Sequence, residues 1–308
     1  MERKYLDNKF TVSDWAIIEP FFKELLGRNI SNKEDLLAWF SDRSELESVL
    51  SEDGAWRYIK MTCDTTDDEL RESFNYFIQE IQPKVAPYGD HLNKKVAAIS
   101  FINEVEAEQG YDIMLRELNK DIEIFKEENI PLYTEMQTKS QEYGQISGAM
   151  TVDVEGNELT LQQAGVELQK TDRNWREKIY NKISTRRLLD RDKLDILFDQ
   201  LIELRDKVGK NAGFENYRDY MFSSMGRFDY TPVDCFNFHE AISSEVVPLL
   251  NEFAQERKQM LAVNNLRPWD KAVDIVGRPP LKAFAGGEDL LDKSIEVFSR
   301  IDPYLGGC

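Results

Sequence analysis

The sequence predicts a mainly α-helical protein with a single β-hairpin. Apolar residues recur at helical spacing through most of the 308 residues. The 16 Gly and 10 Pro are few for this length, which favours long uninterrupted elements over many short strands. One segment, near residues 149–161, changes to short β-prone runs. Hydrophobic residues make up 41% of the chain, which is enough for a packed core and excludes a disordered protein.

The first two helices are predicted from their N-terminal caps and their apolar spacing. Ser13-Asp14 offers side-chain oxygens to the first amides of a helix, and Gly27 closes the apolar run that follows. Asn32 can cap a second helix in the same way. The apolar faces of these two helices are expected to comprise Trp15, Ile18, Phe21, Phe22, Leu25, Leu26, Leu36, Leu37, Trp39, Phe40 and Leu46.

A third helix is predicted after Thr66. Thr66 with Glu69 three residues later is typical of a capping box, and apolar residues follow at helical spacing. Pro83 and Pro87 are expected to end this helix, because proline lacks the amide hydrogen that a helix interior needs. The same periodicity predicts further helices over roughly 91–107, 110–128 and 131–143.

The segment near 149–161 is predicted to form a hairpin. The runs AMTVDV (149–154) and ELTL (158–161) are β-prone, and Glu155-Gly156-Asn157 lies between them as a glycine-containing turn. Two interpretations stay open for it, a surface hairpin that serves packing alone and one with a further role.

Helices resume after the hairpin. Thr171 or Asp172 is expected to cap a long helical run with a break near 190–192, and Gly209 and Gly213 are expected to end it. Proline in the first turn favours a helix that starts at Thr231-Pro232. The remaining expected elements are a short helix over 214–225, a stripe of Cys235, Phe238, Ile242, Val246, Leu249 and Phe253 on the helix after Thr231, a loop over 263–286 anchored by Trp269, and a final helix over about 287–301.

Charge and cysteine content restrict the class of protein. Lys plus Arg number 39 and Asp plus Glu 57, a formal charge of −18, and such a surface repels phosphate backbones. The cysteines Cys63, Cys235 and Cys308 form no Cys-x-x-Cys pair, which suits a reducing compartment. The N-terminus has no apolar signal core, and no apolar run approaches a membrane span. We therefore expect a cytoplasmic protein with neither nucleic acid nor membrane as a partner.

The two histidines do not predict a metal site. A zinc peptidase needs two His one helical turn apart and a Glu beside the first. His239-Glu240 has this start, but Ser243 stands where the second His is required, so His239 is interpreted as an ordinary helix residue. His91 is expected on the surface, in a turn formed by Gly89–Leu92. There is also no Gly-x-Ser-x-Gly elbow and no phosphate-binding glycine loop, so no catalytic or metal-binding residue is assigned.

Two other tracts have two possible interpretations each. Residues 170–193 carry nine basic and four acidic side chains, which fits either a patch that meets an anionic group or a solvated helix face with local pairs such as Arg173–Glu177. Residues 53–61, DGAWRYIKM, combine aromatic rings with cations. These rings could stack on a ligand or belong to the core beside the apolar stems of the cations.

Several stretches, taken in order, resemble the oligoendopeptidase F-like zinc metallopeptidases, relatives of thimet oligopeptidase. Together they cover essentially the whole chain. They are DRSELE (42–47), SEDGAWRYIKMTCDTTDDEL (51–70), EENIPLYTEMQTKSQEYGQISGAMTV (127–152), ELTLQQA (158–164), the helix start at Thr171-Asp172-Arg173, NAGFENYRDYMFSSMGRFDYTP (211–232), LRPWD (266–270) and FSRIDPYLG (298–306).

This resemblance implies a peptidase whose catalytic segment is not in the chain. Members of the family bind zinc through a His-Glu-x-x-His helix and a downstream Glu, and the metal activates water for peptide hydrolysis. None of these positions is present here, so we expect a truncated N-terminal half that binds no zinc and is inactive alone. Residues 1–185 then resemble the N-terminal helical region, and residues 186–308 the start of the catalytic region.

The expected partners follow from the same resemblance. Short peptides are the expected substrates, and the missing catalytic half is expected to pack on this chain. The alternative function is a non-catalytic helical protein, derived from such a peptidase, that binds peptides or serves as a scaffold.

Overall fold

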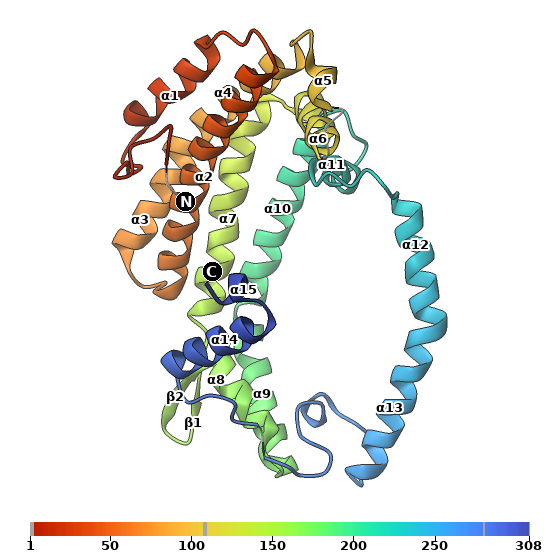
Figure 1. Ribbon diagram of the computed structural model, residues 1–308. Helices are drawn as coiled ribbons and strands as arrows, with labels where there is room; N and C mark the ends of the chain where they lie inside the picture. The colour runs from red at the N-terminus through yellow and green to blue at the C-terminus, as the bar shows by residue number, and fades with distance from the viewer. Residues whose placement is uncertain (1–2, 107–109, 280, 308) are drawn as a thin grey trace. The chain divides into compact units, whose positions relative to one another are not determined.

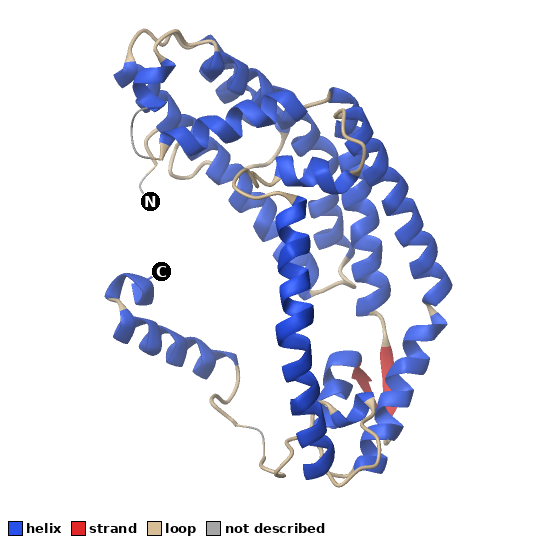
Figure 2. Ribbon diagram, turned by 90° about the vertical axis from the view of Figure 1, so that its right-hand side faces the viewer, coloured by secondary structure: helices blue, strands red, loops and turns tan. Residues whose placement is uncertain are grey.

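The computed structural model describes residues 3–106, 110–279 and 281–307 (Figure 1). It confirms a mainly helical fold with one two-stranded hairpin in the described part of the chain (Figure 2). The chain forms two compact units, each built from two segments: Met1–Met150 with Leu189–Glu240, and Thr151–Leu188 with Ala241–Cys308. The division at residue 185 stays a prediction. Residues 1–2, 107–109, 280 and 308, which the predicted elements and regions above include, lie outside the described residues.

The first helices of the first unit begin where their caps predict. Helix α1 spans Trp15–Gly27, and the Asp14 carboxylate accepts hydrogen bonds from the amides of Ala16 and Ile17. Helix α2 spans Lys33–Cys63, and the Asn32 side chain accepts from the amide of Asp35. Their buried faces meet helices α4 (Gln82–Ala97) and α6 (Tyr111–Ile124) in one core, whose fully buried side chains include Ile18, Phe22, Leu25, Leu36, Trp39 and Leu46.

Two predictions in the next segment are wrong. Helix α3 (Asp68–Tyr76) is capped by Asp67, whose carboxylate accepts from the amide of Leu70, while the Thr66 hydroxyl donates to Asp64. The acidic side chain one residue later has the better position for the cap. Pro83 and Pro87 do not end the helical run, because both lie inside α4.

The chain passes both prolines because the local helix geometry changes and the core compensates. A π-helical turn, η1 (Phe77–Ile81), precedes α4 (Gln82–Ala97) and places Pro83 in the first turn, where no amide hydrogen is needed. Pro87 is further inside α4. The same helix buries Leu92 and Val96 completely, and this packing outweighs one lost hydrogen bond.

The rest of the first unit is helical with shorter breaks. The predicted helix over 91–107 is interrupted, because α4 ends at Ala97 and a separate α5 spans Ile102–Glu106. Gly209 lies inside its helix and does not end it; a Cβ there would lie 3.3 Å from the backbone of Asn216. The other elements are α6 (Tyr111–Ile124), a short 3-10 turn η2 (Glu127–Asn129), α7 (Ile130–Gly148), α10 (Arg191–Asn211), α11 (Tyr217–Ser224) and α12 (Pro232–Ala241).

The second unit contains the hairpin. Strands β1 (Thr151–Val154) and β2 (Asn157–Thr160) are antiparallel with Val152 opposite Leu159. The turn residues Glu155 and Gly156 have φ of 57° and 85°, the left-handed pair that a two-residue hairpin turn requires. The hairpin packs on α8 (Leu161–Val166) and α9 (Arg173–Leu189) around Val152, Val154, Ala164, Ile179 and Ile183.

The remaining elements of this unit follow the sequence pattern. The Asp172 carboxylate accepts from the amides of Asn174 and Trp175, so Asp172 is the residue that caps α9. The loop over 263–286 is confirmed for its described residues, 263–279 and 281–286. The other elements are η3 (Glu167–Gln169), the π-turn η4 (Ile242–Val246), α13 (Val247–Met260), the short 3-10 turn η5 (Pro268–Asp270) within the loop, α14 (Gly287–Ile301) and α15 (Pro303–Gly307). None of the helices in the described residues is both long and apolar enough to cross a membrane.

Candidate functional site

The two histidines lie on exposed helix surfaces and do not form a metal site. His91 is in the interior of α4, so the predicted turn is wrong, although its surface position is confirmed. His239 lies on α12 with its ring edge against Phe236, at 6.4 Å between centroids. Across residues 3–106, 110–279 and 281–307, no group of three or more His, Cys, Asp or Glu side chains could hold a metal ion. The donor set of this part of the chain therefore does not fit zinc.

Two arginines of the basic segment 170–193, both in the second unit, bind an anionic group in that unit. Asp270 is fully buried, and Arg173 binds it in a bidentate manner, with Nε 3.0 Å from Oδ1 and Nη2 2.9 Å from Oδ2. The buried Arg176 donates to the same carboxylate at 3.0 Å and to the carbonyl of Trp269 at 2.9 Å. The ion pair of Arg173 is thus with Asp270, and Glu177 contributes only a weaker electrostatic interaction.

This arrangement fixes the loop 263–286. Burial acts to raise the pKa of Asp270, but hydrogen bonds from Arg173, the Arg267 amide and Arg176 outweigh it and lower the pKa to about 2. Arg257 of α13 donates to the backbone carbonyl of Asp270 at 3.0 Å. Trp269 packs against Tyr180 with ring centroids 5.5 Å apart. The anchor of the loop is therefore Asp270 as well as the predicted Trp269.

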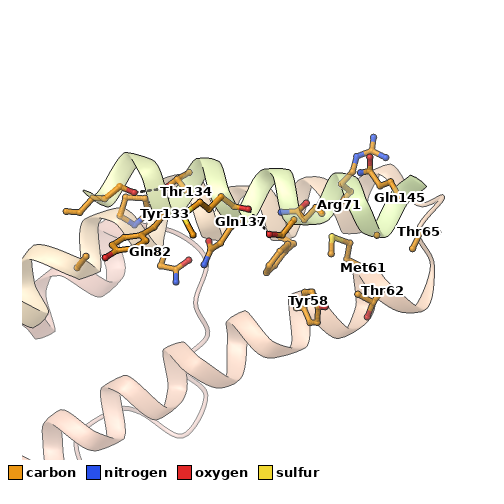
Figure 3. A pocket seen from close by; sticks show the side chains of 18 residues that line it. Tyr58, Met61, Thr62, Thr65, Arg71, Gln82, Tyr133, Thr134, Gln137 and Gln145 are labelled. Carbon is orange, nitrogen blue, oxygen red and sulfur yellow. Dashed lines mark hydrogen bonds between the residues drawn. The ribbon is translucent and has the colours of Figure 1, made fainter. Parts of the chain in front are cut away.

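A cavity of about 600 Å³ lies in the first unit between α2, α3, the start of α4 and α7 (Figure 3). Helices wall it on several sides, and its lining combines apolar with polar side chains, which makes it the candidate binding site. Its lining consists of Tyr58, Met61, Thr62, Thr65, Arg71, Phe74, Gln82, Pro83, Ala86, Ile130, Tyr133, Thr134, Met136, Gln137, Ser140, Gln141, Gly144 and Gln145.

The aromatic tract on α2 is divided between the two interpretations. Tyr58 and Met61 line the cavity, and the Tyr58 ring is 5.5 Å from that of Phe74. Arg57 does not line it; its guanidinium pairs with Asp53 at 2.7 Å and donates to the Val12 carbonyl at 2.8 Å. The tract therefore presents an aromatic ring to the cavity and uses its cation to hold α2 in place.

The polar groups of the cavity are almost all uncharged. None of its eighteen lining residues is Asp or Glu, and its one cation, Arg71, is paired with Asp68. The Tyr133 hydroxyl is hydrogen-bonded to that of Tyr220, and burial followed by this bond raises the pKa of Tyr133, so its phenol stays neutral. The Nε2 atom of Gln141 is buried and has no hydrogen-bond partner in the described structure.

Sequence reasoning missed this site, although α7 carries a signal for it. Thr134, Gln137, Gln141 and Gln145 recur three or four residues apart and therefore share one face of the helix. An uncharged polar stripe of this kind, in a chain with 57 carboxylates, indicates a surface that avoids charge. The pattern shows the face but not what lies opposite it.

The comparisons with known proteins show to which family this helical fold belongs. The family model of the peptidase M3 N-terminal domain matches residues 5–125, and that of peptidase family M3 matches residues 166–275. The chain belongs to peptidase family M3. The predicted resemblance to oligoendopeptidase F-like peptidases is thereby confirmed.

Solved structures share this fold. A protein assigned as an oligoendopeptidase F from Bacillus anthracis has a TM-score of 0.87 at 21% identity over 96% of this chain and 54% of its own. PZ peptidase A, solved with an inhibitor, has a TM-score of 0.88 at 19% identity, over 97% and 53%. The oligoendopeptidase F of Enterococcus faecium has 0.66 at 13%, over 92% and 57%. The chain thus spans about half the length of these relatives. No curated protein matches it significantly.

Proposed function

We propose that this chain is part of a zinc-dependent oligoendopeptidase that hydrolyses peptide bonds within short peptides, and that it does not hydrolyse them alone. The observation that carries the proposal is the match to the peptidase M3 models over 5–125 and 166–275. The family uses zinc, and the described residues do not supply its donors, because both histidines are exposed and neither belongs to a group of metal ligands. Under this proposal the zinc ligands come from additional polypeptide.

We further propose that such polypeptide, of the length that the solved relatives have beyond this chain, packs against its exposed apolar helices. Helix α14 has an apolar face of which Leu291, Val297 and Ile301 are more than half exposed. Helices α12 and α13 likewise expose Phe236, Phe238, Leu250 and Phe253, so part of the predicted stripe after Thr231 is uncovered in the described structure. Apolar surfaces of this extent are typical of interfaces. No observation favours the non-catalytic scaffold over the peptidase, and a cytoplasmic location stays a prediction.

The purified 308-residue chain is expected to show no hydrolysis of an internally quenched short peptide, with or without added Zn²⁺. The physical reason is that one exposed imidazole, His239, with Ser243 four residues on cannot hold the metal in a three-ligand site. The readout is fluorescence release over a zinc titration, with a chelator control. Zinc-stimulated, chelator-sensitive cleavage by the chain alone would contradict the proposal, whereas the same activity in a longer polypeptide that includes these residues would support it.

The isolated chain is also expected to associate or to bind a hydrophobic dye. Replacing Leu291 and Phe253 together by Ser should reduce both effects, because each side chain is an exposed part of the apolar faces of α14 and α13. Sedimentation velocity and dye fluorescence measure the change. The matched control is Leu188→Ser, which removes an equally exposed leucine outside these helices. A wild-type chain that stays monomeric and binds no dye would refute the interface.

A further inference from the structure

We propose that the cavity between α2, α3 and α7 is a binding site for an uncharged, apolar segment of a peptide. The peptide nature of the ligand rests on the proposed function. The preference for a neutral and apolar ligand rests on the cavity itself (Figure 3).

The charge of the cavity selects against ionic ligands. Asp and Glu make up 57 of 308 residues, yet none lies among the eighteen that line this cavity. A cationic ligand would therefore lose its hydration without gaining a carboxylate partner. An anionic ligand would meet Arg71 alone, which already pairs with Asp68, in a chain whose net charge of −18 repels it. A neutral ligand meets neither penalty.

The apolar part of the lining provides the contact area. The Tyr58 ring is 51% exposed and lies 5.5 Å from the ring of Phe74, which also lines the cavity. Met61 of α2 and Met136 of α7 add flexible, polarisable side chains. A ligand side chain that covers the Tyr58 ring would remove apolar surface from water, which is the main source of affinity in such a site.

The polar part of the lining matches a peptide backbone. Gln82, Gln137 and Gln145 lie around the cavity, and each carries both a donor and an acceptor, as the peptide group does (Figure 3). Gln141 of the same stripe also lines the cavity, but its Nε2 atom is buried and has no hydrogen-bond partner in the described structure. Tyr133 is already bonded to Tyr220, so its ring is a fixed wall of the cavity.

The position of the cavity agrees with this role. Two of the stretches that carry the family resemblance, 51–70 and 127–152, contribute four and nine of its eighteen lining residues and so meet across it. A cavity of about 600 Å³ lies within the usual range of ligand sites, and it suits a segment of roughly two to three residues.

The test is direct binding of blocked tripeptides to the intact 308-residue chain by isothermal titration. The probe is N-acetyl-Ala-Phe-Leu-amide, which has no charge at either end. The comparison peptides are N-acetyl-Glu-Phe-Glu-amide and N-acetyl-Lys-Phe-Lys-amide. We expect the neutral peptide to bind at least about tenfold more tightly than either charged one.

The variants locate the binding. Gln137→Glu adds a carboxylate to the cavity at constant side-chain size, and it is expected to weaken binding of the neutral peptide about tenfold or more. The matched control is Gln255→Glu on the exposed surface of α13. It makes the same charge change outside the lining and should leave binding unchanged. Tyr58→Ala should weaken binding by a similar factor, because it removes the exposed ring. Circular dichroism and thermal unfolding confirm that each variant is folded.

Three results of the binding measurements would overturn the proposal, and one displacement result would do so as well. They are no binding of the neutral peptide, equal binding of the charged peptides, or unchanged binding in folded Gln137→Glu and Tyr58→Ala chains. Displacement of the peptide by hexanol, with equal sensitivity to both variants, would also overturn it by showing a general apolar cavity. None of these measurements depends on hydrolysis, so loss of the cavity site and loss of the peptidase proposal are separate outcomes.

Discussion

Replacement of Asp270 by Ala is expected to destabilise the second unit by about 3–5 kcal/mol, the usual result when one partner of a buried ion pair is removed. Asp270 is fully buried, and its removal leaves the buried guanidinium of Arg176 without its counter-ion. The loop 263–286 would also lose its hydrogen bonds to Arg173. Calorimetry measures the loss in unfolding free energy, and hydrogen exchange of residues 263–275 locates it.

The pH dependence gives the sign of this contribution. The pKa of Asp270 is lowered from 3.8 to about 2 in the folded chain, so folding favours the ionised carboxylate. Its stabilisation is fully present above pH 3.8 and is lost as the pH falls toward 2. The difference in stability between wild type and Asp270→Asn should therefore shrink on acidification. A difference that grows below pH 4 would contradict the assignment.

Asp274 provides a matched control for this prediction. Its carboxylate pairs with Arg278 at 2.9 Å, and this hydrogen bond, with those from backbone amides, also lowers its pKa to about 2. The pair lies at the surface, where solvent screens it. Asp274→Asn should therefore change the unfolding free energy much less than Asp270→Asn. Equal losses would show that burial is not what makes Asp270 important.

Replacement of Trp39 by Ala is expected to cost about 3–5 kcal/mol in the first unit, as for large aromatic side chains removed from a packed core. Trp39 is fully buried in the core formed by α1, α2 and α4, and its indole nitrogen donates to the Leu25 carbonyl at 2.9 Å. The substitution leaves a cavity that the surrounding helices can fill only in part. Chemical unfolding followed by circular dichroism measures the loss.

Two variants separate the causes of this loss. Trp39→Phe keeps most of the ring volume, and the Leu25 carbonyl still accepts from Lys95 at 3.0 Å, so the loss should be much smaller than for Ala. Trp56→Ala, on the same helix but 53% exposed, should have little effect. If Trp56→Ala were as costly as Trp39→Ala, burial in the core could not be the reason.

The elements predicted correctly are those whose conformation depends on residues close to one another in the sequence. Asp14 and Asn32 cap their helices because their oxygens reach amides two or three residues away. The hairpin forms where predicted because Glu155 and Gly156 adopt left-handed conformations in the turn. The failure at Pro87 has the opposite origin. Pro83 fits locally into the first turn of α4, whereas packing of α4 in the core, which no local pattern reveals, carries the helix through Pro87.

The functional residues also divide into those that local sequence decides and those that only tertiary contacts decide. The two histidines and Ser243 were enough to show that this chain has no His-Glu-x-x-His motif, because metal-ligand spacing on a helix is a property of sequence. The partner of Arg173 could not be read from the sequence, because Asp270 is 97 residues away and the adjacent Glu177 fits the local rule equally well.

The sequence by itself determined the helical class, most helix starts, the hairpin and the family resemblance, because each depends on periodicity, caps or ordered motifs along the chain. Only the tertiary structure decided that the α7 stripe from Thr134 to Gln145 faces Tyr58 and Met61 of α2 across a cavity without carboxylates. It also decided that Asp270 is the counter-ion of Arg173 and Arg176 in the basic segment 170–193. Both arrangements depend on contacts between residues far apart in sequence, and such contacts are set by how the helices pack.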